Sequence, residues 1–219
     1  MSTSSSYQKM NKILCPALRI GVTEGELKPC EKGTVTESEL RDYMSYLGWK
    51  EKSVISKFID KAKSYDPNNE VINICEFRGT GFDHGSSSGI INCHHDDNAE
   101  GYYPDRMALM MKYANANNEL GYRELAHFAG ECHRNPVNFG SAKGRAFLMA
   151  EFANILAIFG RKNENGKLVL KTEDVDALWK EARFPDGWEK PPKPFYGTFT
   201  TIINVVRMHF LLWFTKPRR

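Results

Sequence analysis

The sequence lacks an excess of charge of either sign. Its 219 residues include 30 Lys or Arg and 27 Asp or Glu, which leaves a net charge of +3. The basic residues are dispersed among acidic ones and form no continuous stripe, so the electrostatic footprint of a nucleic-acid-binding protein is missing. We therefore expect no nucleic-acid partner.

An apolar run long enough to span a membrane is also missing, since a span needs roughly 18 residues. The apolar segment nearest the C-terminus is interrupted by Arg207 and His209. We expect this segment to form a packed terminal helix. The less favoured alternative is docking on a membrane surface through this helix and the cations Lys216, Arg218 and Arg219.

The N-terminal residues show no apolar run behind a basic start, which is the pattern of a signal peptide. We therefore expect an intracellular, cytoplasmic protein. An odd number of cysteines cannot all pair, and no Cys-x-x-Cys spacing occurs, so we expect reduced thiols. The five cysteines are Cys15, Cys30, Cys75, Cys93 and Cys132.

Helical periodicity dominates the rest of the chain. Thr36 and Glu39 form a capping-box pattern ahead of an apolar repeat, and Gly48 marks the end of that helix. The segment 71–75 is short and apolar, which fits a strand or a turn of helix equally well. Further helices are predicted at 54–62, 104–116, 122–133, 141–159, 173–182 and 198–214.

Three groups of residues could carry chemistry. Cys15 is followed by Pro16, whose fixed backbone leaves nearby amides free to point at the sulfur and stabilise a thiolate. The glycine-rich loop near residues 79–101 holds Asp83, His84 and Ser87, which could ligate Mg²⁺ or move protons. Taken alone, Cys15 is also compatible with an ordinary buried cysteine, and the glycine-rich segment with an ordinary polar loop.

Glu151 lies within an apolar helical pattern. Three of its four neighbours at helical spacing are apolar, so its carboxylate is predicted to face the interior. Burial of a carboxylate is costly and raises its pKa. Such a group is either a structural partner or an acid–base group, and both interpretations stay open on this pattern alone.

The order of these motifs resembles the heme-thiolate peroxidases, the family of chloroperoxidase and the unspecific peroxygenases, and especially its short branch. The similar stretches cover roughly residues 14–203, with a weak patch from 88 to 103. They read Leu14-Cys-Pro-Ala-Leu18, Phe82-Asp-His-Gly-Ser-Ser87, Arg134-Asn-Pro136, Met149-Ala-Glu-Phe-Ala153 and Trp188-Glu-Lys190.

The resemblance implies an all-α, single-domain fold over residues 12–219. The polar composition of residues 1–11 predicts a flexible lead ahead of it. It implies heme b with Cys15 as the axial iron ligand and Pro16 beside it. Glu151 would be the distal acid–base group toward hydrogen peroxide, oriented by His84. Asp83 and Ser87 would hold a Mg²⁺, although Gly85 stands where the family has an acidic residue. We expect that magnesium site to be weak or absent.

The resemblance therefore predicts a heme-thiolate peroxygenase or peroxidase that oxidises a small organic molecule with hydrogen peroxide. One step of secondary metabolism is the setting that we expect for it. Three alternatives remain. The chain could oxidise halide, or bind heme without peroxidase turnover. It could instead lack heme and use Cys15 as a nucleophile beside a histidine.

Overall fold

The computed structural model describes residue 13 and residues 15–50, 59–60, 71–75, 90, 102–134 and 142–216. The helices are α2 (Pro16–Thr23), α3 (Glu37–Tyr46), α5 (Pro104–Met111), α6 (Tyr122–Arg134), α7 (Ala142–Phe159), α8 (Thr172–Val175), the π-helix η1 (Asp176–Glu181) and α9 (Thr198–Phe214). The strands are β1 (Thr34–Thr36), β2 (Val71–Asn73), β3 (Glu119–Leu120), β4 (Arg161–Lys162) and β5 (Leu168–Lys171).

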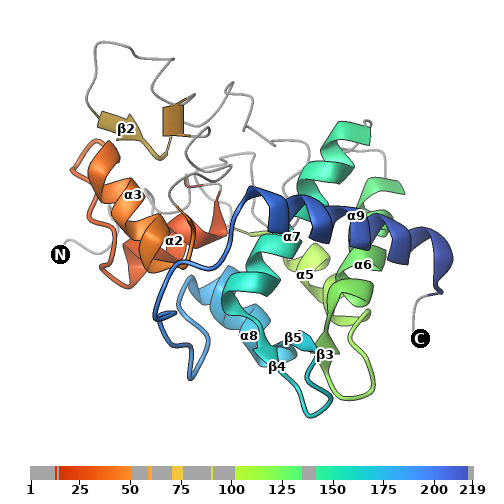
Figure 1. Cartoon of the computed structure of the whole chain (residues 1–219). Coiled ribbons are helices and arrows are strands. Elements are labelled where there is room, and N and C mark those ends of the chain that lie inside the picture. Colours follow the sequence, from red (N-terminus) through yellow and green to blue (C-terminus); the bar gives the residue numbers. More distant parts are fainter. Residues whose placement is uncertain are drawn as a thin grey trace.

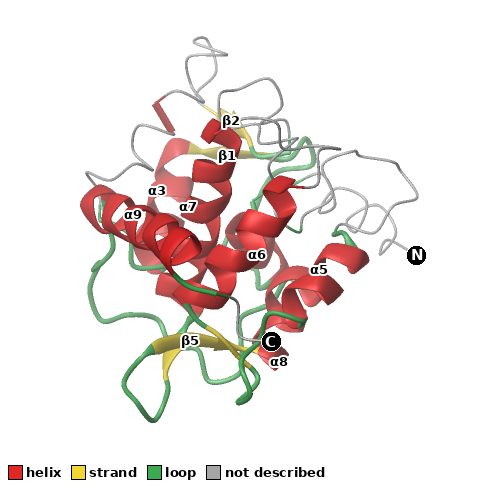
Figure 2. Cartoon of the chain, turned by 90° about the vertical axis from the view of Figure 1, so that its right-hand side faces the viewer, coloured by secondary structure: helices red, strands yellow, loops and turns green. Residues whose placement is uncertain are grey.

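Helices α6, α7 and α9 pack against one another and form the centre of the molecule. Helix α9 crosses the outer side of the other two, as the two perpendicular views show (Figure 1, Figure 2). An aromatic cluster joins α6, α7 and η1: the ring centroids of Phe128 and Phe152 lie 5.3 Å apart, and those of Phe152 and Trp179 lie 6.2 Å apart. All three side chains are fully buried. Within the described ranges, no helix combines the length and hydropathy needed to cross a bilayer.

The prediction of an all-α fold is wrong, because two small antiparallel sheets accompany the helices. Strands β1 and β2 pair in one sheet, and the second has the order β3-β5-β4. The strands are two to four residues long, too short for a period of two to stand out in the sequence. The hairpin between β4 and β5 turns at Gly166, with φ +68°. Its Asn165-Gly166 pair is the signal that could have revealed it.

Helix α3 begins at the capping box that the sequence predicts. The N–H of Glu39 donates to Thr36 Oγ1 at 3.2 Å, and the N–H of Thr36 donates to Glu39 Oε2 at 2.7 Å. Both halves of the capping box are therefore present, as predicted. The helix ends ahead of Gly48, whose φ of +95° favours glycine.

Other helix boundaries differ from the predicted ones. The helix predicted at 104–116 ends at Met111. An asparagine turn follows it: Asn115 Oδ1 accepts the N–H of Asn117 at 2.9 Å and of Glu119 at 3.0 Å, and Asn118 has φ +56°. The side chain of Asn115 thus gives these backbone donors a non-helical partner.

The helix predicted at 173–182 is divided between α8 and η1. Its first turn is capped by Asp174, whose Oδ2 accepts the N–H of Lys171 at 2.8 Å. The helix begins one residue earlier than predicted, because Thr172 already has helical backbone. The segment ends at Ala182, which has φ +51°.

Candidate functional site

Cys15 occupies the N-cap position of α2, a helix that the sequence did not indicate. Its backbone is extended (φ −85°, ψ 118°), and Pro16 follows as the first helical residue. Proline suits that position because it lacks the N–H that a helix start leaves unpaired. The backbone amides of Ala17 and Leu18, in the first turn of α2, lower the pKa of the Cys15 thiol. The Cys-Pro pair therefore places the sulfur beside the N-terminus of a helix.

The groups around the Cys15 sulfur shift the pKa of its thiol in opposite directions. Burial of the thiol raises its pKa most, the Leu18 amide lowers it, the Glu151 carboxylate raises it and the Ala17 amide lowers it, and the pKa reaches about 11. The group is therefore a thiol at neutral pH. A metal cation at this sulfur displaces the proton, because coordination deprotonates a thiol, and the two amides then stabilise the resulting charge.

Glu151 lies in the middle of α7, among the buried side chains of Leu148, Phe152 and Ile155. Its Oε1 atom is shielded from solvent. The pKa of Cys132 on α6 is raised to about 12. Burial raises it most, Arg106 lowers it, and the carboxylates of Glu131 and Glu151 raise it further. The Glu151 carboxylate therefore raises the pKa of two thiols, that of Cys15 ahead of α2 and that of Cys132 on α6, the helix against which α7 packs.

Helix α2 is held in place by a tyrosine from α3. Tyr43 Oη donates to the carbonyl of Ala17 at 2.5 Å, and the side chain is only 2% exposed. The ring fits because α2 has glycine at position 21: a Cβ there would lie 2.7 Å from Tyr43 Oη. Tyr43 thereby positions the turn that follows Cys15. The sequence presented Tyr43 only as an apolar position of a helix, with no signal for this partner.

Asp83, His84 and Ser87 lie outside the described residues. The predicted support of Glu151 by His84, and the predicted magnesium ligands, therefore stay predictions. Among the residues that the structure does describe, no cluster of three or more His, Cys, Asp or Glu side chains is arranged to hold a metal ion. Heme iron needs only one protein ligand in this arrangement, and Cys15 is the residue predicted to supply it.

A separate cavity of about 310 Å³ opens at the C-terminal end of α7. Its lining includes Phe159, Arg161, Trp188 and Phe195, but neither Cys15 nor Glu151. Trp188 stacks on Phe184, with ring centroids 4.2 Å apart, and donates from Nε1 to the carbonyl of Ile158 at 2.9 Å. This cavity is therefore distinct from the Cys15–Glu151 site.

Comparison of the chain with known protein families and with curated proteins gives no match of either kind.

Proposed function

We propose that this chain is a heme-thiolate peroxygenase or peroxidase that uses hydrogen peroxide to transfer oxygen to, or oxidise, a small organic molecule. One observation supports the proposal: Cys15 is the N-cap residue of α2, where the Ala17 and Leu18 amides lower the pKa of its thiol and the Glu151 carboxylate of a different helix raises it. A thiolate ligand and an acid–base carboxylate, brought together from distant parts of the sequence, are the two groups that this chemistry requires.

The residues present fit a heme-thiolate site. Cys15 would hold the iron of heme b, and the N–H groups of Ala17 and Leu18 would stabilise the negative charge of its thiolate. A thiolate-ligated heme supplies the cleavage of the O–O bond of peroxide. The rigid start of α2, fixed through Tyr43 and Ala17, keeps the sulfur in one position.

Glu151 would act on protons. Its carboxylate would accept the proton that peroxide releases and return it to the oxygen that leaves as water. The shielding of Oε1 suits that role, because bulk water is kept from one carboxylate oxygen. His84 is proposed to orient Glu151, and Asp83 and Ser87 to bind Mg²⁺ weakly, on the resemblance alone.

The pKa of Cys15 weighs against the reading in which Cys15 is a free nucleophile. A catalytic cysteine is activated by a lowered pKa or by an adjacent base, whereas burial raises the pKa of this thiol to about 11. Oxidation of halide remains an alternative use of the same site. Dependence of the turnover on added chloride or bromide separates halide oxidation from direct oxidation of an organic molecule.

The test is spectroscopic and kinetic. The purified chain, supplied with hemin, is expected to give the red-shifted Soret band of a thiolate-ligated ferrous–CO complex. Cys15→Ser should lose that band, whereas Cys30→Ser, a matched change at an exposed thiol, should keep it. Glu151→Gln should bind heme with an unchanged spectrum but react with peroxide roughly 10²–10⁴-fold more slowly.

Three results would contradict the proposal. A protein that stays colourless with hemin would exclude the heme site. A Cys15→Ser protein that keeps the thiolate band would show that another residue is the ligand. If Glu151→Gln reduces peroxide at the parent rate while both spectra behave as expected, Glu151 is a structural carboxylate and the chain is a heme-binding protein of another mechanism.

A further inference from the structure

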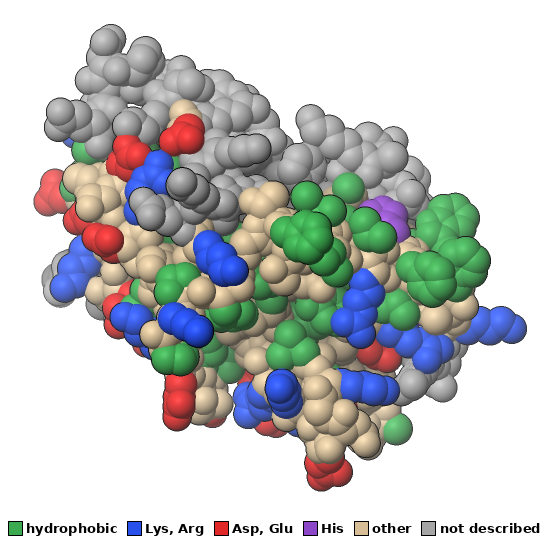
Figure 3. Space-filling model, in the orientation of Figure 1, with side chains coloured by type: hydrophobic (Ala, Val, Ile, Leu, Met, Phe, Trp, Pro, Cys, Tyr) green, Lys and Arg blue, Asp and Glu red, His purple; other side chains and the backbone are tan. Residues whose placement is uncertain are grey.

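Helix α9 presents large apolar side chains to solvent along its whole length. Phe199 is 76% exposed, Val206 62%, Trp213 69% and Phe214 73%. With Ile202, Ile203 and Phe210 they recur at intervals of three or four residues, so they form one continuous stripe on the helix. Figure 3 shows green side chains gathered along α9 on the outer face of the molecule. We call these seven residues the α9 stripe.

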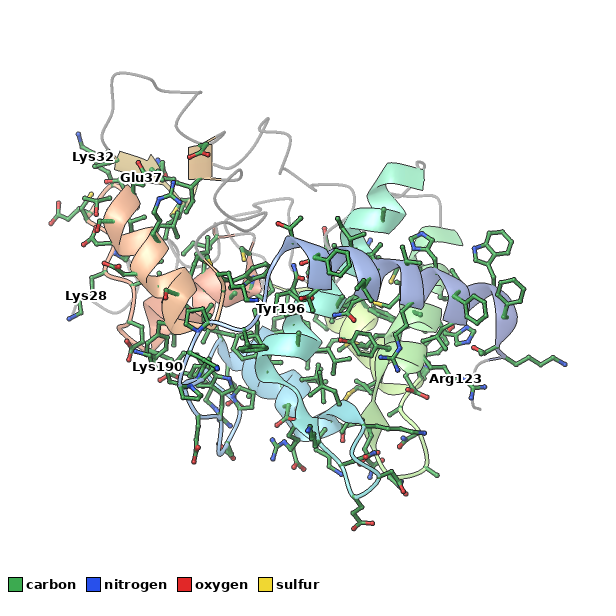
Figure 4. All side chains as sticks on the ribbon, viewed as in Figure 1. Lys28, Lys32, Glu37, Arg123, Lys190 and Tyr196 are labelled. Atoms are coloured by element: carbon green, nitrogen blue, oxygen red, sulfur yellow. The ribbon has the colours of Figure 1, made fainter. Side chains whose placement is uncertain are left out.

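The opposite side of α9 is the one that is buried, and it carries Met208 together with two polar residues, Thr201 and Asn204. Thr201 Oγ1 donates to the carbonyl of Gly197 at 3.2 Å, and Asn204 Nδ2 donates to Tyr196 Oη at 3.3 Å. Tyr196 is itself anchored, with its carbonyl accepting the N–H of Lys50 at 2.8 Å. Figure 4 labels Tyr196 at the start of α9. The polar side is therefore satisfied inside the protein.

The far end of α9 is fixed as well. Leu212 packs over Gly130 of α6, where a Cβ would come within 2.5 Å of its Cδ1. His127 Nε2 shares a hydrogen bond with Thr215 Oγ1 at 3.0 Å, and Arg123 donates to the carbonyl of Lys216. Figure 4 labels Arg123 near this end of the helix. These contacts hold the stripe outward, so the helix cannot simply roll over to bury it.

The segment that carries the α9 stripe has charge of one sign. From Lys190 to Lys216 the sequence contains no Asp or Glu. Lys193, Arg207 and Lys216 are exposed, with the Arg207 guanidinium over the Tyr122 ring, and blue side chains lie beside the green ones in Figure 3. A partner that covers the stripe must therefore be apolar where it meets the exposed rings. It must be negatively charged where it meets the flanking Lys and Arg side chains.

From this pairing of an outward apolar stripe with acid-free basic flanks, we propose that α9 docks in the plane of an anionic lipid surface. An aromatic-rich helical face with Lys and Arg beside it is the pattern of helices that lie in the headgroup region. The helix is 17 residues long, about 25 Å at 1.5 Å per residue, and its stripe projects from the protein, as a planar partner requires.

A second copy of the chain fits this surface less well. A two-fold dimer pairs a patch with itself, so Arg207 and Lys216 would face the same cations of the partner across a dehydrated interface. Neither flank offers an acid to neutralise them. A bilayer that contains anionic phospholipid supplies both the apolar depth and the negative charge. This inference is independent of the heme-thiolate proposal, because it uses none of the same residues.

Trp213 provides the measurement. The other three tryptophans, Trp49, Trp179 and Trp188, are buried or half-buried, so Trp213 is the exposed one of the four. Vesicles of phosphatidylcholine with phosphatidylserine should shift the protein's fluorescence to the blue and sediment with the full-length chain. Binding should weaken as salt is raised, because salt screens the charges. Vesicles of phosphatidylcholine alone should bind much less.

Matched variants separate the stripe from its flanks. Phe199→Ser with Phe214→Ser removes two exposed rings and should abolish the shift, without a loss of helix by circular dichroism. Lys193→Glu with Lys216→Glu should weaken binding at least about tenfold, since each basic residue near an anionic surface contributes separately. Lys162→Glu with Lys167→Glu is the control, an equal charge change at exposed positions of the β4–β5 hairpin, and should bind close to the parent level.

Three outcomes would overturn the proposal. One is a parent protein that neither sediments with anionic vesicles nor shifts its fluorescence. Another is equal binding to neutral vesicles with no effect of salt. The third is a stable dimer in sedimentation velocity that the Phe199→Ser, Phe214→Ser protein loses, with no vesicle binding, which would assign the stripe to a second copy.

Discussion

Substitution of Gly21 by alanine tests how α2, and with it Cys15, is held. Alanine is normally the better helix residue, by about 1 kcal/mol relative to glycine. At this position, however, the new Cβ would lie 2.7 Å from both Cε2 and Oη of Tyr43. The ring cannot swing into solvent, because Tyr43 is 2% exposed and stacks on Tyr46 with centroids 6.2 Å apart. We therefore expect Gly21→Ala to destabilise the protein.

The magnitude follows from three contributions. Overpacking of a filled core costs about 1–3 kcal/mol. Displacement of the ring also breaks the Tyr43 Oη to Ala17 hydrogen bond, a loss of about 1 kcal/mol. The gain in helix propensity offsets about 1 kcal/mol of this total. The free energy of unfolding should fall by about 1–3 kcal/mol, which for a chain of this size lowers the melting temperature by roughly 2–4 °C per kcal/mol.

The assay is urea unfolding of four proteins, followed by circular dichroism: the parent, Gly21→Ala, Tyr43→Leu and the double variant. In the Tyr43→Leu background the overlap is gone, so Gly21→Ala should become neutral or stabilising by up to about 1 kcal/mol. This reversal of sign is the decisive result. If alanine stabilises the parent, or destabilises both backgrounds equally, the packing of Tyr43 into the space over Gly21 does not position α2.

Two further predictions concern ionisation. The pKa of Glu119 is lowered to about 2, from an ordinary 4.5, chiefly by hydrogen bonds from Lys171 and Asn163, so its carboxylate stabilises the fold above pH 4.5 and this contribution is lost as the pH falls toward 2. Glu119→Gln should therefore remove part of the acid sensitivity of urea unfolding in that window and not elsewhere; an unchanged acid profile would refute it. In the heme-free protein, Cys15 should be alkylated slowly at neutral pH and faster as the pH approaches 11, when each thiol is followed by peptide mass spectrometry. Glu151→Gln should shift that profile to lower pH, because a negative charge near the sulfur is removed; an unshifted profile would mean that the two residues do not interact.

Sequence alone determined the features that depend on neighbouring residues. The capping box at Thr36 and the helix end at Gly48 follow from residues within a few positions of the backbone that they affect, and the limits of α9 at residues 198–214 are those that the sequence predicts. The candidate thiol and carboxylate were also visible, because Cys15 precedes proline and Glu151 interrupts an apolar helix. The short strands could not be predicted from the sequence, since two to four residues carry too little periodicity.

Only the tertiary structure decided which of these residues meet. That the carboxylate of Glu151 raises the pKa of Cys15 depends on where the fold places α7 relative to the start of α2, and no local pattern encodes that placement. The orientation of α9 was decided in the same way. Its sequence predicts a packed terminal helix, and it does pack on α6 and α7. Yet Asn204, on the polar side of the helix, donates to Tyr196, and Leu212 packs over Gly130. Most of the apolar surface of α9 is therefore left facing outward.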